Sequence, residues 1–321
     1  MAGKSFHFNG IQAVLTDLGM DAKKANMVAS ASQAVDDFHE DKLIVFDDGR
    51  MFYPVVTAHK SFDADNLDSR DASNVWMPFH FFPNAHGVCE PDTPNVDLLI
   101  QFVKTRIDST EYTDNEKCLY LGILLHILVD TFTHRGFMGL YCRHNDISAL
   151  EDEDAFDLGF TANALPAIGH GEALTYPDDM WRRWSYRDHQ DVKQTRDNKE
   201  VFSDIVEKIP GYLQRLGMET REMDRAKASK YKEIFAMEEG HDKAFDQITL
   251  ANVPAGESIG YQYWRDQTLR GVQSKDNTWI KIDPNTFESS NWVLFQKAAK
   301  EIRTFFKEAI FPGLTINTKV Y

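Results

Sequence analysis

Apolar side chains recur every three or four positions along most of this chain, which is the spacing of a helix with one buried face. In residues 5–38 the pattern predicts two helices, with Gly19 ending the first and Asp21 capping the second. The same spacing predicts helices over about 95–110, 115–134, parts of 198–247, and 290–310. The chain is therefore expected to be mostly helical.

Other segments break this periodicity. Two short extended runs, 43–46 and 51–56, flank the turn signal Asp47-Asp48-Gly49 and predict one small β-hairpin. Residues 61–95 carry several prolines and are expected to be rich in loops, and 160–190 should be loop and short helix. The predicted fold class is all-α, a helical bundle with long loops. We expect a metal-binding catalytic core over 1–195 and a helical extension over 196–321 that packs on it.

The segment 115–134 carries the most informative chemistry. It is apolar enough to be a buried helix, yet it holds His126, Asp130 and His134 at steps of four. Four residues turn a helix by about 400°, so the three side chains share one flank. A buried carboxylate needs compensation for its lost hydration, and a divalent metal ion between carboxylate and imidazoles supplies it. The alternative is a His–Asp hydrogen-bonded pair inside a helical core.

Further imidazoles and carboxylates are spread over the first 180 residues. The remaining candidate metal ligands are His7, Asp36, Asp37, His59, His170 and Asp178. Such a set suits Zn²⁺, with iron or manganese as options. It exceeds the four or so ligands of one zinc ion, so two or three ions are expected, with Asp130 bridging two of them. One of Asp36 and Asp37 is expected to bind metal, and the other to orient a histidine or act as the general base.

Five motifs resemble a known superfamily, the zinc-dependent phospholipases C together with the single-strand-specific zinc nucleases. The segments are 32–37 (SQAVDD), 57–60 (TAHK), 76–83 (WMPFHFFP), 125–134 (LHILVDTFTH) and 169–178 (GHGEALTYPD). The likeness covers roughly residues 5–190 and is greatest to an uncharacterised bacterial branch. It implies an all-helical bundle with a cluster of three metal ions in a cleft.

The resemblance also implies how the ligands divide among the ions. The first ion would take Asp36 or Asp37 with His59, His126 and Asp130. The second would take Asp130 and His7, although the chain has no match to the N-terminal tryptophan that completes this site in the family. The third would take His134, His170 and an acid. Leu174 stands where the family has a glutamate, so Asp178 or Glu172 is expected to replace it.

The leading functional prediction is a phospholipase C-like phosphodiester hydrolase, in which a metal-activated water attacks phosphorus and Asp36 or Asp37 handles its proton. Phe79, Phe81 and Trp76 are expected to receive the apolar part of the substrate, and His80 either lines the same cleft or packs in the core. One alternative is a zinc nuclease that stacks single-stranded bases on Trp76 or Phe79. Another is a non-enzymatic, metal-stabilised toxin or binding module.

The composition limits which binding partners and which cellular compartment are expected for this protein. The 321 residues carry a formal charge of −15, which argues against a broad basic groove for duplex nucleic acid. A small phosphoester or a phospholipid headgroup remains a suitable ligand, with peripheral membrane contact through an aromatic stripe at 290–310. Three cysteines are too few for a disulfide scaffold. With no signal-peptide pattern, the protein is expected in the cytoplasm where it is made. Export by a signal-independent secretion system, with a delivery or neutralising partner, is also considered.

Overall fold

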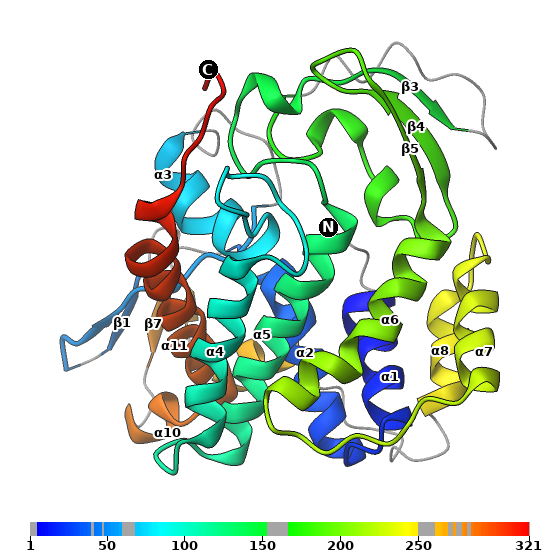
Figure 1. Cartoon of the computed structure of the whole chain (residues 1–321). Coiled ribbons are helices and arrows are strands. Elements are labelled where there is room, and N and C mark those ends of the chain that lie inside the picture. The colour runs from blue at the N-terminus through cyan, green and yellow to red at the C-terminus, as the bar shows by residue number, and fades with distance from the viewer. Residues whose placement is uncertain are drawn as a thin grey trace.

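The computed structural model describes residues 5–39, 42–46, 48–59, 68–152, 166–249, 261–268, 272–273, 278–280 and 284–320. Its centre is a pair of buried helices, α2 (Ala22–Asp37) and α5 (Asp114–Thr133), which pack along each other (Figure 1). Asp21 caps α2, as predicted, by accepting hydrogen bonds from the amides of Lys23 and Lys24. A capping box between Thr113 and Glu116 begins α5.

The close contact between α2 and α5 depends on a glycine. A Cβ atom added to Gly122 of α5 would collide with the carbonyl oxygen of Val28 and lie 2.5 Å from the Cβ atom of Ala31, both on α2. No side chain larger than hydrogen fits at that crossing without moving a helix backbone. Gly122 therefore sets the distance between the two helices that the candidate site uses.

Further helices surround this pair, and the prediction of a mostly helical chain is confirmed. They include α1 (Ile11–Asp17), α4 (Pro94–Asp108), α6 (Asn198–Arg215), α7 (Arg225–Phe235), α8 (His241–Thr249) and α11 (Asn291–Phe305). A π-helical segment, η1 (Ser5–Gly10), leads into α1, and another, η8 (Phe306–Ile310), follows α11. Other helical segments are α3 (Ser69–Asp71), α9 (Tyr261–Thr268), α10 (Pro284–Glu288), η4 (Arg143–Asn145), η6 (Gly171–Ala173), η7 (Tyr176–Asp178) and η9 (Phe311–Gly313).

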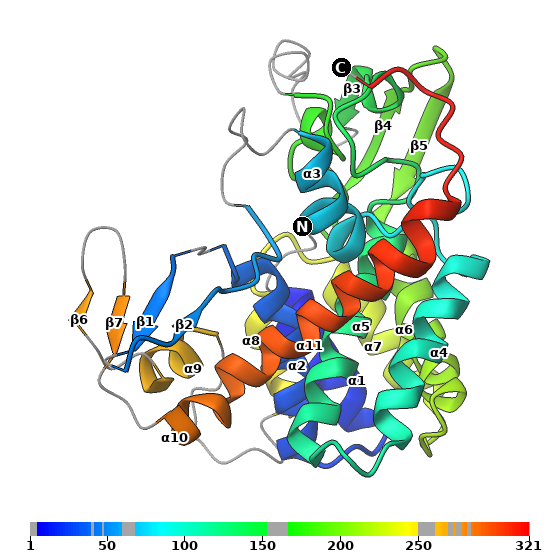
Figure 2. The same ribbon diagram turned by 90° about the vertical axis from the view of Figure 1, so that its left-hand side faces the viewer.

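Two small sheets stand at different places on the helical body (Figure 2). In the first, β1 (Ile44–Phe46) and β2 (Met51–Phe52) form the predicted hairpin. It is extended by β7 (Thr278–Ile280), parallel to β1, and β6 (Val272–Gln273), in the order β2-β1-β7-β6. The second sheet is antiparallel, with the order β3-β4-β5, and comprises β3 (Ser148–Asp152), β4 (Arg183–Arg187) and β5 (Lys193–Asp197). Strand β4 corrects the prediction of loop and short helix for 160–190.

The predicted loop region 61–95 also contains an unexpected helix. Residues 61–67 lie outside the described part of the chain, but Ala72–His80 form the π-helix η3. Pro78 has no amide hydrogen, and the amide of Phe81 bonds the carbonyl of Trp76 five residues back. This wide last turn brings His80 into the interior, where its side chain is fully buried.

The second half of the chain packs on the first. The Phe6 ring lies 4.8 Å from Phe202, 6.0 Å from Phe235 and 6.4 Å from Phe245, centroid to centroid. Near the C-terminus, the amide of Arg143 donates to the carbonyl of Lys319 at 3.0 Å. The boundary at residue 195 stays a prediction. Among the described helices, none combines the length and apolar character that a bilayer-spanning segment requires.

Candidate metal centre

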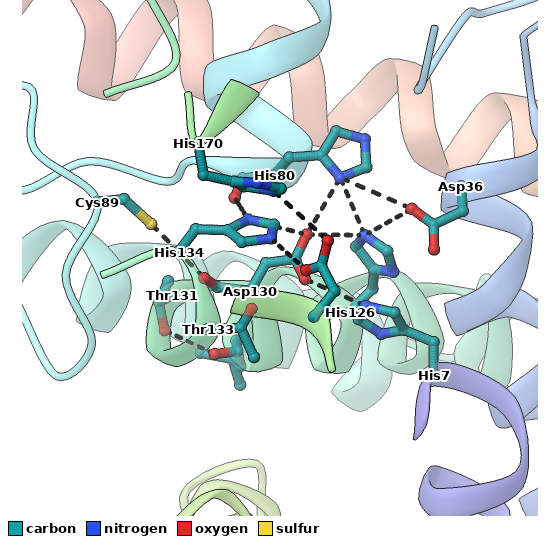
Figure 3. Close-up of polar contacts among 12 residues, drawn as sticks. His7, Asp36, His80, Cys89, His126, Asp130, Thr131, Thr133, His134 and His170 are labelled. Carbon is teal, nitrogen blue, oxygen red and sulfur yellow. Dashed lines mark hydrogen bonds and ion pairs between the residues drawn. The ribbon is translucent and has the colours of Figure 1, made fainter. Parts of the chain in front are cut away.

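The flank of α5 predicted from its four-residue spacing faces the interior. His126 and Asp130 lie on the helix and His134 is its C-cap, and all three side chains are fully buried. Figure 3 shows Asp130 among the imidazoles, with Asp36 and His7 on one side and His134 and His170 on the other. The helix thus presents one carboxylate to histidines from several other segments.

Each oxygen of Asp130 has imidazole neighbours. Oδ1 lies 3.1 Å from Nε2 of His7, which comes from η1. Oδ2 lies 3.1 Å from Nδ1 of His80, 3.2 Å from Nε2 of His126 and 3.6 Å from Nδ1 of His134. Asp130 is therefore the common neighbour of four histidines.

Asp36, in the last turn of α2, completes a first group of ligands. Its Oδ1 lies 3.8 Å from Nε2 of His126 and 3.9 Å from Nδ1 of His80, and those two nitrogens are 3.3 Å apart. In a tetrahedral zinc site with bonds of 2.0–2.1 Å, neighbouring ligand atoms are about 3.3 Å apart. The five measured separations among Asp36, His80, His126 and Asp130 run from 3.1 to 3.9 Å, near that value. His7 can form an overlapping group with Asp36 and His126.

A second group lies at the end of α5. Nε2 of His134 is 3.1 Å from Oδ1 of Asp178, and Nε2 of His170 is 3.6 Å from Oδ2 of the same carboxylate. His170 is the N-cap of η6 and Asp178 ends η7. The side chains of His170 and Asp178 remain 12% and 8% exposed, so this group borders the solvent.

Backbone carbonyls fix which nitrogen of three histidines faces the cluster. Nε2 of His80 lies 2.8 Å from the oxygen of Thr57, Nδ1 of His134 lies 2.8 Å from the oxygen of His80, and Nδ1 of His170 lies 3.0 Å from the oxygen of Leu174. A carbonyl oxygen only accepts, so these ring nitrogens carry the proton. The other nitrogen of each ring faces a carboxylate, which is the side from which a ring nitrogen can bind a cation.

Burial and neighbouring charges set the protonation states that metal binding needs. Burial lowers the pKa of His7, of His126 to about 4 and of His170 to about 3, so these rings are neutral at pH 7. Burial disfavours the charge of Asp130, but His134, His126 and His7 hold its pKa well below the usual range. Neutral imidazoles and an ionised carboxylate are the forms that bind metal.

Asp36 provides a direct test of whether these residues suit a cation. Its Oδ1 is buried and accepts no hydrogen bond from the described residues, and burial raises the pKa of this carboxyl to about 6. A buried acceptor without a donor is costly, and a divalent cation at the centre of the first group would satisfy it. His126 adds a ring nitrogen, Nε2, to the same centre. The donor set therefore fits a divalent metal ion.

Two predicted ligands lie apart from these groups. Asp37 has an oxygen 3.5 Å from the side-chain amide of Gln33 and belongs to none of the three groups formed by the described residues. His59 is likewise outside them, with its Nε2 3.5 Å from Asp71 and its ring 5.5 Å from Trp76. His80, and not His59, lies beside His126 and Asp130, where the sequence-based prediction placed His59.

The aromatic residues expected to contact substrate are mostly buried. Phe79 lies in the hydrophobic core, and Phe81 stacks on His134 with ring centroids 4.8 Å apart. Trp76 lies 6.1 Å from the ring of His80. Gly169 permits the packing of Phe81, because a Cβ atom there would meet the Phe81 ring. Phe81 and Trp76 thus support candidate ligands, and a contact with substrate stays a prediction for all three aromatics.

The adjacent pair Asp36 and Asp37 allows a matched test. We expect Asp36→Asn to lower the metal content by about one ion per chain, because its carboxylate faces His80 and His126. Asp37→Asn removes the same charge one residue away and should leave the metal content unchanged. Elemental analysis of both purified variants decides this, and equal loss in the two would contradict the assignment.

These observations define a mostly helical protein in which buried histidines and aspartates form candidate metal sites. A family model matches residues 3–310, and the chain belongs to that family, described as "Family of unknown function (DUF6765)". Comparison with the curated proteins and with the solved structures gave no match.

Proposed function

We propose that this protein is a metal-dependent phosphodiester hydrolase of the phospholipase C type, with zinc as the resident ion. The observation that carries the proposal is the contact between the two ligand groups. His134 belongs to the second group through Nε2, while its Nδ1 lies 3.6 Å from Asp130 of the first. The motifs shared with the zinc phospholipases and nucleases add support, including LHILVDTFTH at 125–134.

Neighbouring divalent cations supply Lewis acidity and a nucleophile at neutral pH, which suits attack on a phosphodiester. Within the chain, Asp36, His80, His126 and Asp130 would hold one ion, and His134, His170 and Asp178 another. His7 would hold a third ion or reinforce the first through Oδ1 of Asp130. The 8% exposure of the Asp36 side chain leaves it a path to solvent, and we propose that it also positions the proton of the attacking water.

Chelation tests the proposal directly. We expect the purified protein to hydrolyse bis(4-nitrophenyl) phosphate, to lose this activity after dialysis against a chelator, and to regain it when zinc is added back. The reason is that without metal the groups contain only carboxylates and imidazoles, which supply no Lewis acid to activate a water. Release of nitrophenolate measures the rate.

Two further substrates separate the alternatives. Faster turnover of phosphatidylcholine vesicles than of single-stranded DNA supports the phospholipase hypothesis, and the reverse supports the nuclease hypothesis. Stoichiometric metal without turnover of any substrate would point to a metal-stabilised binding protein. Full activity in chelated protein would overturn the metal-dependent mechanism.

A further inference from the structure

A separate pocket lies beyond the end of α5 and is lined in part by Arg135, Gly136 and Phe137, the residues that follow His134. It encloses about 480 Å³, within the range of small-molecule sites. Four of its lining residues are basic side chains, Arg135, Arg196, His144 and His189, on a chain whose net charge is −15. We propose that this pocket binds a small organic anion with an aromatic or otherwise flat apolar body. The inference does not depend on the proposed hydrolase activity.

Arg196 is held rigidly in this pocket. Its Nη1 donates to the carbonyl of Thr133 at 3.0 Å and its Nη2 donates to the carbonyl of Arg135, at the end of α5. The guanidinium carbon lies 5.7 Å from the centroid of Phe137 and 5.6 Å from that of Trp184. A guanidinium has five N–H donors and keeps its charge when buried, so a fixed arginine is suited to recognising an oxyanion.

The other basic residues differ in how their hydrogen-bonding groups are used. Arg135 is largely exposed and approaches Glu90 only at 3.9 Å, so its guanidinium can turn toward a ligand. Nε2 of His189 lies 3.3 Å from the side-chain nitrogen of Gln190, which donates, so Nδ1 of His189 carries the ring proton. His189 therefore offers a further donor. Nε2 of His144 donates to the carbonyl of Gly136 at 2.9 Å.

The acidic residues of the pocket are already engaged by the backbone. Oδ1 of Asp188 accepts from the amides of Gln190 and Val192 at 2.9 and 3.0 Å. Asp197 accepts from the amide of Lys199 at 3.1 Å and caps α6. Backbone donors occupy these carboxylate oxygens without removing their charge, so the formal charges of the two aspartates and the two arginines in the lining balance. The guanidinium groups of Arg135 and Arg196 are then the cationic donors that an anion can contact.

Aromatic rings form the apolar wall. Phe137 and Tyr186 stack with centroids 5.7 Å apart and planes inclined by 24°, and both line the pocket. Val88 and Ile147 add aliphatic surface. A flat apolar body can pack on this wall while its anionic group reaches the guanidinium groups.

Calorimetric titration with benzenesulfonate tests the inference, since a sulfonate is a poor metal ligand and should avoid the candidate metal centre. We expect saturable binding to the full-length protein that weakens with added salt. The double variant Arg135→Ala/His189→Ala should bind at least ten-fold more weakly. Lys193→Ala, which removes a positive charge from β5 at a residue paired with Glu151 outside the pocket lining, should change the affinity less than two-fold.

A metal-centre variant distinguishes the two sites. Asp130→Asn should retain benzenesulfonate binding if the pocket is the site. Loss of binding in Asp130→Asn, unchanged affinity in the double variant, or no saturable heat at millimolar ligand would each overturn the proposal. Because the hydrolase assays do not enter this test, its failure leaves the proposed function to be decided separately.

Discussion

Asp130→Asn is expected to lose most of the bound metal and at least about a thousand-fold in phosphodiesterase rate. Mutation of a residue that only supports a metal ligand typically lowers metal affinity or activity roughly 10–100-fold. Asp130 is itself a candidate ligand and the charged neighbour of four candidate histidine ligands, so its loss should cost more. An amide keeps the shape of the side chain but removes its negative charge. Elemental analysis and the nitrophenyl phosphodiester assay measure the two effects.

Two companion variants make this result interpretable. Asp71→Asn neutralises a carboxylate that pairs with His59, outside the ligand groups of the described residues, and should keep full metal content. His170→Ala affects only the second group, at its solvent border, and should lose about one ion. Retention of the wild-type metal content by Asp130→Asn, with its circular dichroism unchanged, would contradict the central role of this carboxylate.

Gly122→Ala is expected to destabilise the fold and to disturb the candidate metal centre from a distance. The added methyl group would meet the backbone of α2 at Val28, which cannot turn aside as a flexible side chain can. Overpacking of this kind costs about 1–3 kcal/mol, and the separation of α2 from α5 would increase. Asp36 would then move relative to His126, so the metal content should fall as well.

The matched control is another glycine within a helix. Gly211 of α6 is exposed and has no atom within 4 Å of an added Cβ. Gly211→Ala should stabilise the protein by roughly 0.5–1 kcal/mol, because alanine loses less backbone entropy in a helix. Denaturant unfolding of both variants gives the comparison, and equal stability would show that the α2–α5 contact is looser than the structure indicates.

The sequence predicted those parts of the fold that have a strong periodic signal. The major helices, the Asp21 cap and the β1–β2 hairpin were all expected from local patterns. Strand β4 was not, since Trp184, Ser185 and Tyr186 are buried in succession and lack the alternation of a half-exposed strand. The pairing of β1 with β7 joins residues far apart in the chain, and no local pattern reveals such a contact.

The candidate site, like the fold, was predicted where a local sequence pattern exists and missed where none does. The spacing of His126, Asp130 and His134 placed them on one flank, and the structure brings them together with His7, Asp36, His170 and Asp178. The sequence could not rank His59 against His80, because each follows a short apolar run. The deciding feature is the π-helical turn at Pro78, which directs His80 inward. A proline two residues before the histidine was the available signal.

The packing of Phe6 has a consequence for how the protein is made. His7 follows a ring that is covered by Phe202, Phe235 and Phe245, so the packing around its segment is complete only after the second half of the chain has been synthesised. Contacts of such long sequence separation form late and slowly. In a ribosome-bound nascent chain that ends before α6, the packing of His7 should therefore be incomplete, and a metal site that includes His7 should fill only after release from the ribosome.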